Sequence, residues 1–185
     1  PPEVRQYPGA GFLVAEKPVQ LLQQWAARHR RQYHYPVIGI TGSNGKTILK
    51  EWIFQALREK LRMVRSPKSY NSQLGVPLSV LQMEAQHDLG IFEAGISRPG
   101  EMARLQQIIR PTIGIFTNIG DAHQEQFRSL EEKAAEKMQL FNNANVLIAR
   151  ASHEMVLRMA GGLKELQQVF TWAVGQEADV VFEHQ

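Results

Sequence analysis

Residues 37–47 have the sequence VIGITGSNGKT, in which a short apolar run passes directly into a stretch of small residues that ends in Gly45-Lys46-Thr47. The apolar run predicts a buried β-strand, and the small residues predict a tight turn. A helix is predicted straight after the turn, because apolar side chains recur there on one helical face. Those side chains are Leu49, Trp52, Ile53, Ala56 and Leu57. Strand, glycine-rich turn and helix together form the first half of a βαβ unit.

The same alternation of strands and helices continues on both sides of this unit. An earlier helix is predicted from Pro18, and Ser129 with Glu132 forms a capping box that opens a later one. The remaining segments are strands over 88–93, 112–118 and 146–149, a helix over 100–109, and weaker signals for a helix near 153–160 and strands near 168–172 and 179–183. We therefore expect an α/β fold with a mainly parallel sheet and helices on both faces. In such sheets ligands gather at the carboxyl ends of the strands.

Composition narrows the range of functions. The chain has 185 residues, of which 43% are hydrophobic and 21% charged, a balance typical of soluble globular proteins. It contains no Cys, which excludes disulfides, thiol catalysis, iron–sulfur clusters and Cys-ligated zinc. The formal net charge of +3 is small for a nucleic-acid-binding domain, and no apolar run approaches the ~20 residues that span a bilayer. We expect a cytosolic monomer that binds neither nucleic acid nor membrane.

The turn after the first strand of this unit suits a polyphosphate. Backbone N–H groups of small residues between a strand and a helix point into one concavity at the positive end of the helix. Lys46 adds a positive charge, and Thr47 offers a hydroxyl that can ligate Mg²⁺. The strict Walker pattern requires Gly where this chain has Ile40, so the match is to a variant loop, and the alternative is an ordinary βα turn. The residues assigned to nucleotide binding are Thr41, Gly42, Ser43, Asn44, Gly45, Lys46 and Thr47.

Polar residues follow other predicted strands in the same way. Glu93 ends one strand and is a candidate Mg²⁺ ligand, with a solvated strand-exit Glu as the alternative. His123 follows the next strand and is equally suited to ligating a metal or capping a loop, while Asp121 is a competing ligand. Lys133 and Lys137 lie one turn apart on the helix opened by Ser129, and their spacing does not favour one over the other.

Together these residues resemble the central ATP-binding domain of the Mur ligases, the amide-forming enzymes of peptidoglycan precursor synthesis. Residues 39–47 (GITGSNGKT) match the phosphate loop of that family, including the Ile where Walker A has Gly, and residues 93–95 (EAG) match its metal-binding Glu motif. Residues 117–123 (TNIGDAH) resemble its His motif in the form typical of the D-alanyl-D-alanine-adding members, and residues 69–78 (SYNSQLGVPL) resemble the Asn-rich loop of those members. Lys137 stands where the family has a carbamylated lysine, which favours it over Lys133.

The resemblance implies a P-loop NTPase-like domain that uses ATP and up to two Mg²⁺ ions to join D-Ala-D-Ala to UDP-MurNAc-tripeptide through an acyl phosphate. It implies catalytic roles for Lys46, His123 and Lys137, the last of these carrying a carbamate. The implied metal ligands are Thr47, Glu93, His123 and Lys137. Asn71 and Ser72 are the implied substrate contacts.

The resemblance also implies a domain division. Residues 1–35 are expected to be an arm from an N-terminal substrate domain, and residues 36–185 the central ATP-binding domain. The chain begins Pro1-Pro2 without Met, so we expect it to be a piece of a longer enzyme that lacks the C-terminal domain and is inactive alone. Residues 150–153 (RASH) depart from the acidic pair often seen at this place in the family.

Three alternatives stay open at this point. A folylpolyglutamate synthase or cyanophycin-type ligase shares the loop, although Ala122-His123 and the Gly-Val-Pro segment argue against it. A nucleotide-binding switch is the second alternative, but the sequence has no guanine-reading Asn-Lys-x-Asp motif. The third is a non-catalytic scaffold, which the presence of all four motifs disfavours.

Overall fold

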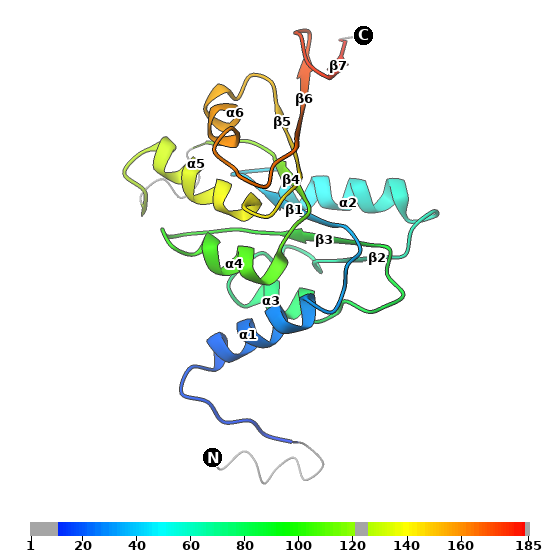
Figure 1. Ribbon diagram of the computed structural model, residues 1–185, viewed down its shortest axis with the longest axis vertical. Helices are drawn as coiled ribbons and strands as arrows, with labels where there is room; N and C mark the ends of the chain where they lie inside the picture. Colours follow the sequence, from blue (N-terminus) through cyan, green and yellow to red (C-terminus); the bar gives the residue numbers. More distant parts are fainter. Residues whose placement is uncertain (1–10, 121–125, 184–185) are drawn as a thin grey trace.

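The computed structural model describes residues 11–120 and 126–183, and in them seven strands form a single sheet (Figure 1). The strands are β1 (Val37–Thr41), β2 (Met63–Arg65), β3 (Leu89–Glu93), β4 (Ile113–Phe116), β5 (Val146–Arg150), β6 (Gln168–Val174) and β7 (Val180–Phe182). They lie in the order β2-β3-β1-β4-β5-β6-β7, and all neighbouring pairs are parallel. The predicted parallel α/β fold is thereby confirmed.

Helices connect most of the strands. They are α1 (Pro18–Arg30), α2 (Lys46–Leu57), α3 (Gly75–Val80), α4 (Met102–Ile109), α5 (Leu130–Met138), the 3-10 turn η3 (Gln139–Phe141) and α6 (Glu154–Ala160). Each helix predicted from the sequence is present, and the Ser129 side chain accepts a hydrogen bond from the N–H of Glu132 at the start of α5, as predicted. The sequence did not predict β2 or α3.

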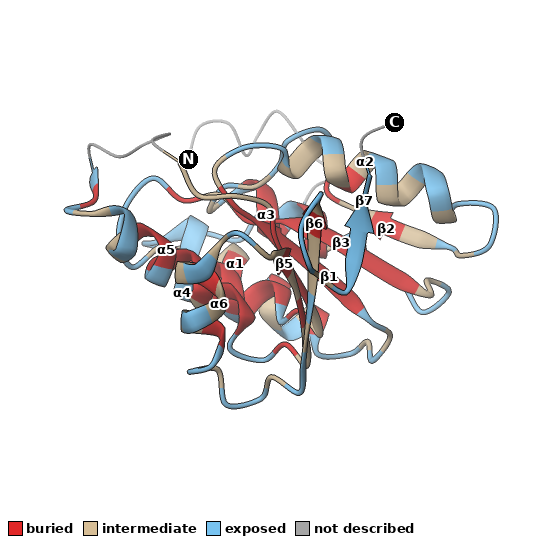
Figure 2. Ribbon diagram, turned by 90° about the horizontal axis from the view of Figure 1, so that it is seen from above, coloured by how far each residue is buried: buried red, intermediate tan, exposed pale blue. Residues whose placement is uncertain are grey.

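The two faces of the sheet are covered unequally. One face packs against α2, whose Leu49, Ile53 and Leu57 contact apolar side chains of β1, β3 and β4. The other face carries α3, α4, α5 and α6, with α1 packed on α3 and α4, and this side holds the larger core, as the distribution of buried residues shows (Figure 2).

The buried face of α2 is rotated from the one predicted. Trp52 is 66% exposed and Ala56 is also exposed, so the prediction that they face the core is wrong. Lys50 is instead fully buried. On a helix, a residue at position 50 shares its face with Ile53 and Leu57, and this is the face that meets the sheet.

A pair of glycines lets η3 approach the sheet closely. Gly39 of β1 and Gly114 of β4 are neighbours in the register. A Cβ on Gly114 would lie 2.4 Å from the ring of Phe141, and one on Gly39 would lie 2.8 Å from the Pro111 ring. Gly39 is therefore required by packing against Pro111. It does not serve as the first glycine of the Walker pattern, whose position is occupied by Ile40.

Helix α1 is joined to the body of the domain by a buried arginine. The Arg30 guanidinium donates hydrogen bonds to the carbonyl oxygens of Ile109 at 2.8 Å, Arg110 at 3.1 Å and Tyr33 at 2.6 Å. Two of these carbonyls belong to the end of α4, where a helix leaves its last acceptors without intrahelical partners. Arg30 thus fixes α1 against α4.

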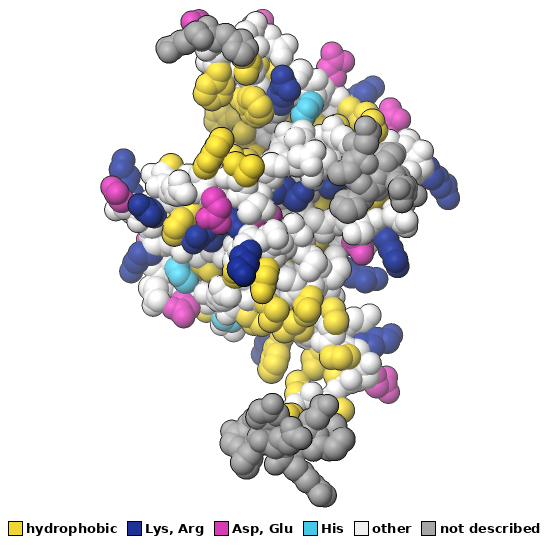
Figure 3. Space-filling model, turned by 180° about the vertical axis from the view of Figure 1, so that it is seen from behind, with side chains coloured by type: hydrophobic (Ala, Val, Ile, Leu, Met, Phe, Trp, Pro, Cys, Tyr) yellow, Lys and Arg dark blue, Asp and Glu magenta, His cyan; other side chains and the backbone are white. Residues whose placement is uncertain are grey.

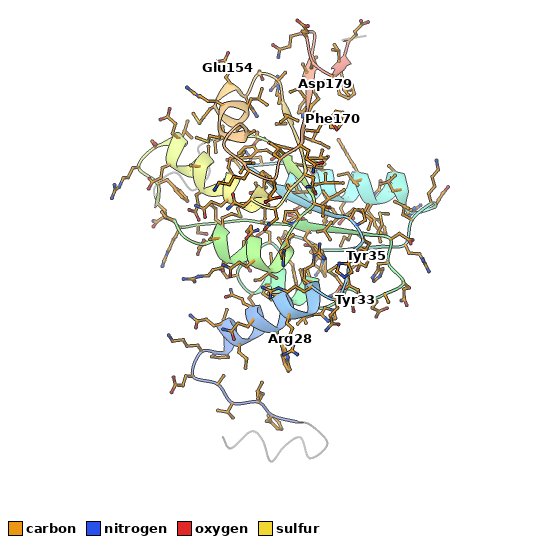
Figure 4. All side chains as sticks on the ribbon, in the orientation of Figure 1. Arg28, Tyr33, Tyr35, Glu154, Phe170 and Asp179 are labelled. Carbon is orange, nitrogen blue, oxygen red and sulfur yellow. The ribbon has the colours of Figure 1, made fainter. Side chains whose placement is uncertain are left out.

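The far end of the sheet, at β6 and β7, is the most exposed part. Figure 4 labels Asp179 between β6 and β7. Its carboxylate accepts hydrogen bonds from the N–H and the hydroxyl of Thr171, at 2.7 and 2.8 Å, which sets β7 against β6. Apolar side chains of Phe170, Val180 and Phe182 are exposed there, and Figure 3 shows hydrophobic side chains gathered at this end. Among the described residues, no helix has both the length and the apolar character needed to cross a bilayer.

Candidate active site

Three loops meet at the carboxyl edge of the central strands. The loop 42–45 leaves β1, residues 94–97 leave β3, and residues 117–120 leave β4. Glu93 lies beside Ile40 in the register, and Thr41 lies beside Phe116. The chain runs to β2 and β3 on one side of β1 and to β4 on the other, so this edge is a topological switch point, where ligands bind in open α/β sheets.

The loop 42–45 is held by the segment that follows β4. Asn118 accepts hydrogen bonds from the N–H of Ser43 through its carbonyl and from the N–H of Asn44 through its side chain, both at 2.9 Å. The Ser43 hydroxyl also accepts from the N–H of Gly120 at 3.0 Å. Thr41 lies beneath the loop, fully buried, and its hydroxyl donates to the carbonyl of Ala94 at 2.9 Å. These contacts fix the loop before any ligand arrives.

Gly42 is required by the shape of this loop. Its φ of +140° lies in a region that other residues rarely adopt. A Cβ at this position would lie 1.9 Å from the hydroxyl oxygen of Thr117, which itself donates to the carbonyl of Asn44 at 2.7 Å. A side chain at position 42 would therefore push the loop away from β4.

Three lysines converge on the loop 42–45 and on the neighbouring segment 117–120. Lys46 donates to the carbonyl oxygens of Gly42 at 2.8 Å and Ser43 at 3.1 Å, and Lys137 donates to Gly42 at 3.2 Å. Lys133 donates to the carbonyl of Gly120. Lys133 and Lys137 are only 1% and 3% exposed, although most helix lysines are solvated. The result is a concentration of positive charge suited to a polyphosphate.

Burial and mutual repulsion change the protonation of these amines. Burial, together with repulsion from the neighbouring Lys46 and Lys133, lowers the pKa of Lys137 to about 7. Burial also lowers the pKa of Lys46, while Glu93 opposes this shift and Lys133 adds to it. Near neutral pH a far larger fraction of Lys137 is therefore unprotonated than of an ordinary lysine.

Thr47 and Glu93, predicted separately as Mg²⁺ ligands, lie in direct contact. The Thr47 hydroxyl donates to Oε2 of Glu93 at 2.9 Å, and Glu93 is fully buried. Neighbouring ligands of octahedral Mg²⁺ are about 2.9 Å apart, given metal–oxygen distances of 2.0–2.1 Å. Both donors are hard oxygen atoms, as Mg²⁺ prefers. The two side chains thus fit a magnesium ion.

The other oxygen of Glu93 faces a residue that sequence reasoning missed. Oε1 lies 3.0 Å from the ammonium of Lys50 in a fully buried ion pair whose angles are not those of a hydrogen bond. The lysine was overlooked because it does not belong to the predicted apolar stripe. Its place on the same helical face as Ile53 and Leu57 was the available signal.

A cleft of about 390 Å³ opens beside the lysines. Its walls include Gly42, Lys46 and Lys137 as well as the predicted substrate residues Asn71 and Ser72. The carbonyl of Asn71 accepts from the N–H of Gly95 at 2.8 Å, which joins the Asn-rich loop to the end of β3. The Ser72 hydroxyl accepts from the N–H of Gly75, the first residue of α3, at 3.1 Å. The remaining wall residues are Val19, Ser43, Gln73, Leu74, Gly95, Ile96, Ser97 and Glu101.

The predictions for Asp121 and His123 lie outside the described residues. Gly120, the last described residue before them, contacts Lys133 and Ser43 of the loop 42–45. Within residues 11–120 and 126–183 there is no cluster of three or more His, Cys, Asp or Glu side chains that could hold a metal ion. Of the proposed metal ligands, the described set therefore comprises Thr47, Glu93 and Lys137.

A variant phosphate loop at a switch point, a Thr–Glu pair suited to Mg²⁺ and buried lysines beside the loop are the arrangement expected of a Mur ligase central domain. In agreement, residues 40–185 match the family model for the Mur ligase middle domain, and the chain belongs to this family. Among curated relatives, it is 39% identical over 132 residues to the UDP-N-acetylmuramoyl-tripeptide–D-alanyl-D-alanine ligase of Borreliella burgdorferi. It is 32% identical over 130 residues to the enzyme of the same name from Bacillus subtilis. Each alignment covers 28% of the relative's own length. The alignment covers 71% of this chain for the Borreliella enzyme and 70% for the Bacillus enzyme.

Solved structures agree with this assignment. The chain resembles MurF from Acinetobacter baumannii, with a TM-score of 0.82 and 26% identity over 91% of this chain and 38% of that one. It resembles MurF ligase from Thermotoga maritima in complex with ADP, with a TM-score of 0.77 and 25% identity over 86% of this chain and 38% of that one. A folylpolyglutamate synthase (FPGS) from L. casei has the same fold, with a TM-score of 0.63 and 14% identity over 92% of this chain and 53% of that one.

Proposed function

We propose that this chain is the ATP-binding central domain of an ATP-dependent amide ligase that joins D-Ala-D-Ala to UDP-MurNAc-tripeptide. The observation that carries the proposal is that Lys46 and Lys137 line one cleft beside the loop 42–45, with the Thr47–Glu93 pair directly after that loop. The names of the curated relatives and the ADP in the Thermotoga structure support the choice of substrates and of ATP.

The reaction has to make a carboxylate reactive toward an amine. A carboxylate oxygen of the tripeptide attacks the γ-phosphorus of ATP, the bond to the leaving oxygen breaks, and ADP departs with the electron pair. The amine nitrogen of D-Ala-D-Ala then attacks the acyl carbon, loses a proton and expels phosphate. Both partners in the first step are anions, so positioning and charge neutralisation dominate the catalytic problem.

Each side chain has a role in that problem. Lys46 exchanges its hydrogen bonds to the carbonyls of its own loop for contacts with the β- and γ-phosphates. The first N–H groups of α2 donate hydrogen bonds to phosphate oxygens. Thr47 and Glu93 hold one Mg²⁺, which neutralises phosphate charge when it is bound. His123 is proposed as a ligand of a second Mg²⁺, and Asn71 and Ser72 as contacts of the acceptor substrate.

We also propose that Lys137 is used as a carbamate. Its unprotonated amine attacks the carbon of CO₂ and loses a proton, which turns a cation into an anion. The depressed pKa supplies the free amine, and the nearby Lys46 and Lys133 stabilise the negative product. The carbamate oxygens would then hold a second Mg²⁺ or orient the phosphates through it. A ¹³C resonance of a carbamate in ¹³C-bicarbonate, absent from Lys137→Ala, is the expected signature.

The chain spans 28% of the curated relatives, so we further propose that residues 1–35 lead from an N-terminal substrate domain and that residues 36–185 form the nucleotide domain of a monomeric cytosolic enzyme. Alone, the chain binds Mg-nucleotide weakly and does not turn over, because the surfaces that carry the acceptor and the amine belong to other domains.

The test is phosphate release by the full-length protein. Release that requires ATP, UDP-MurNAc-tripeptide and D-Ala-D-Ala together is expected, with glutamate unable to replace the dipeptide. Release with a folate and glutamate instead would transfer the assignment to the folylpolyglutamate synthases. Release from nucleotide alone, unaffected by either substrate, would favour a switch.

A further inference from the structure

Lys50 is a fully buried lysine whose ammonium is enclosed by oxygen atoms. It donates to the carbonyl of Ser66 at 2.7 Å and to the carbonyl of Lys68. It also forms ion pairs with Oε1 of Glu93 at 3.0 Å and Oε1 of Glu51 at 3.1 Å. None of the roles proposed above uses this residue.

The surroundings hold this ammonium in one place. Lys68 has a φ of +48°, a conformation that residues other than glycine seldom adopt, and its carbonyl binds Lys50. Glu51 is held in turn by Arg65, whose guanidinium binds the Glu51 carboxylate and lies 3.6 Å from the centre of the Phe54 ring. Backbone strain and a second ion pair therefore support the position of Lys50.

The two oxygens of Glu93 have different neighbours as a result. Oε1 faces the Lys50 ammonium, whereas Oε2 accepts from the Thr47 hydroxyl at 2.9 Å, at the start of the helix that follows the phosphate loop. Turning both oxygens toward a cation at Thr47 would separate a charge pair that is shielded from water. Breaking such a pair is strongly unfavourable.

We propose that Lys50 is a positioning residue that restricts Glu93 to binding through Oε2, and that it thereby selects Mg²⁺ over Ca²⁺ at the nucleotide site. This inference rests on the proposed function. Mg²⁺ requires near-ideal octahedral geometry, and the two oxygens of one carboxylate are too close together to occupy neighbouring corners of that octahedron. Ca²⁺ accepts six to eight oxygen ligands and commonly takes both oxygens of a carboxylate. Restricting Oε1 therefore disfavours Ca²⁺.

A simpler role for Lys50 makes a different prediction. If its ammonium only neutralised Glu93, removing it would change the affinities for both cations by a similar factor. If it holds Oε1, removing it frees the second oxygen and favours Ca²⁺ in particular. The ratio of the two dissociation constants separates the roles, whichever way the absolute affinities move.

The experiment compares calorimetric titrations of Mg·ADP and Ca·ADP into the 185-residue chain, the wild type and Lys50→Met. The ratio of the Ca·ADP to the Mg·ADP dissociation constant should fall by roughly tenfold in Lys50→Met, the low end of the effect of removing a partner of a metal ligand. Lys60→Met, which removes an exposed lysine just beyond α2, is the matched control and should keep the wild-type ratio. A Lys50→Met ratio equal to that of the wild type would overturn the inference.

Two other results are decisive. If the wild type bound neither complex, the proposed function would fail and this inference with it, whereas binding with an unaltered ratio overturns this inference alone. Should Lys50→Met not fold, crystals of the wild type with Ca·ADP and with Mg·ADP give the answer directly. Glu93 should ligate through Oε2 with Oε1 still at Lys50, and ligation through both oxygens would contradict the proposal.

Discussion

Lys50 and Lys137 are both buried lysines on helices, and each lies one turn after another lysine, Lys46 or Lys133. Their surroundings differ completely. Lys50 is enclosed by two carbonyls and two carboxylates, whereas Lys137 contacts one carbonyl and is repelled by two other amines. Equal spacing and equal burial thus produce a fixed cation in one case and a reactive amine in the other. The charge that the fold brings to each lysine makes the difference.

The largest expected effect on stability comes from removing the fixed cation. Lys50→Met leaves the Glu93 carboxylate buried without its ion-pair partner, and the loss should be about 3–5 kcal/mol of unfolding free energy. At pH 7, Lys137→Met, the matched variant, removes an amine whose charged form is disfavoured by burial and by its neighbours, so it should not lower stability. Urea denaturation in magnesium-free buffer measures both. Equal losses for the two variants would contradict the comparison.

Removing Lys137 should affect activity strongly, although it affects stability little. In the full-length protein, Lys137→Ala should lower phosphate release by about 10²–10³-fold, as expected when a group that stabilises transition-state charge is lost. Nucleotide affinity should change little, because Lys46 remains in place. Lys164→Ala, at an exposed position, serves as the control. Normal turnover by Lys137→Ala, with or without added bicarbonate, would remove the carbamate assignment.

A smaller effect should appear in the pH dependence of stability. The pKa of Lys137 is about 7 in the folded chain and near 10.5 when unfolded, so between these values the unfolded state binds more protons. Stability due to Lys137 is therefore lowest below pH 7 and rises by up to roughly 1.4 kcal/mol per pH unit above it. The measurement is the difference in unfolding free energy between the wild type and Lys137→Met from pH 6.5 to 9. A difference that stays constant with pH would mean that this amine is not perturbed.

The smallest expected effect concerns the helix that carries Lys137. Helix α5 begins with a side-chain cap at Ser129, whereas α2, which carries Lys50, begins at Gly45 with no side-chain cap. Ser129→Ala should cost about 1 kcal/mol, and Ser129→Thr should keep most of that stability. Thermal unfolding of the three proteins tests this. An alanine variant as stable as the wild type would show that packing alone fixes α5.

Much of this architecture could be predicted from the sequence because its signals are local. The apolar run of β1, the glycines after it and the Ser129 cap specify their elements without distant contacts. Elements defined by tertiary packing were missed. Strand β2 has only three residues, and α3 contains both Gly75 and Pro77, so neither has a recognisable period.

The candidate site was likewise predictable where sheet topology or a motif places a residue, and not where tertiary packing does. The contact between Thr47 and Glu93 is predictable because Glu93 ends β3 and Thr47 begins the helix after β1, at the same edge of a parallel sheet. Family resemblance favoured Lys137. The burial of Lys133 and the role of Lys50 depend on which carbonyls and carboxylates fold against them, and spacing along a helix does not carry that information. The assignment of His123 remains a prediction.

Calorimetric titration of the 185-residue chain with ATP, ADP and GTP in the presence of Mg²⁺ tests the central claim most directly. We predict that ATP and ADP bind, that GTP is not preferred, and that Lys46→Ala shows no detectable binding. Preferential binding of GTP, or a Lys46→Ala variant that binds ATP as well as the wild type, would contradict the account.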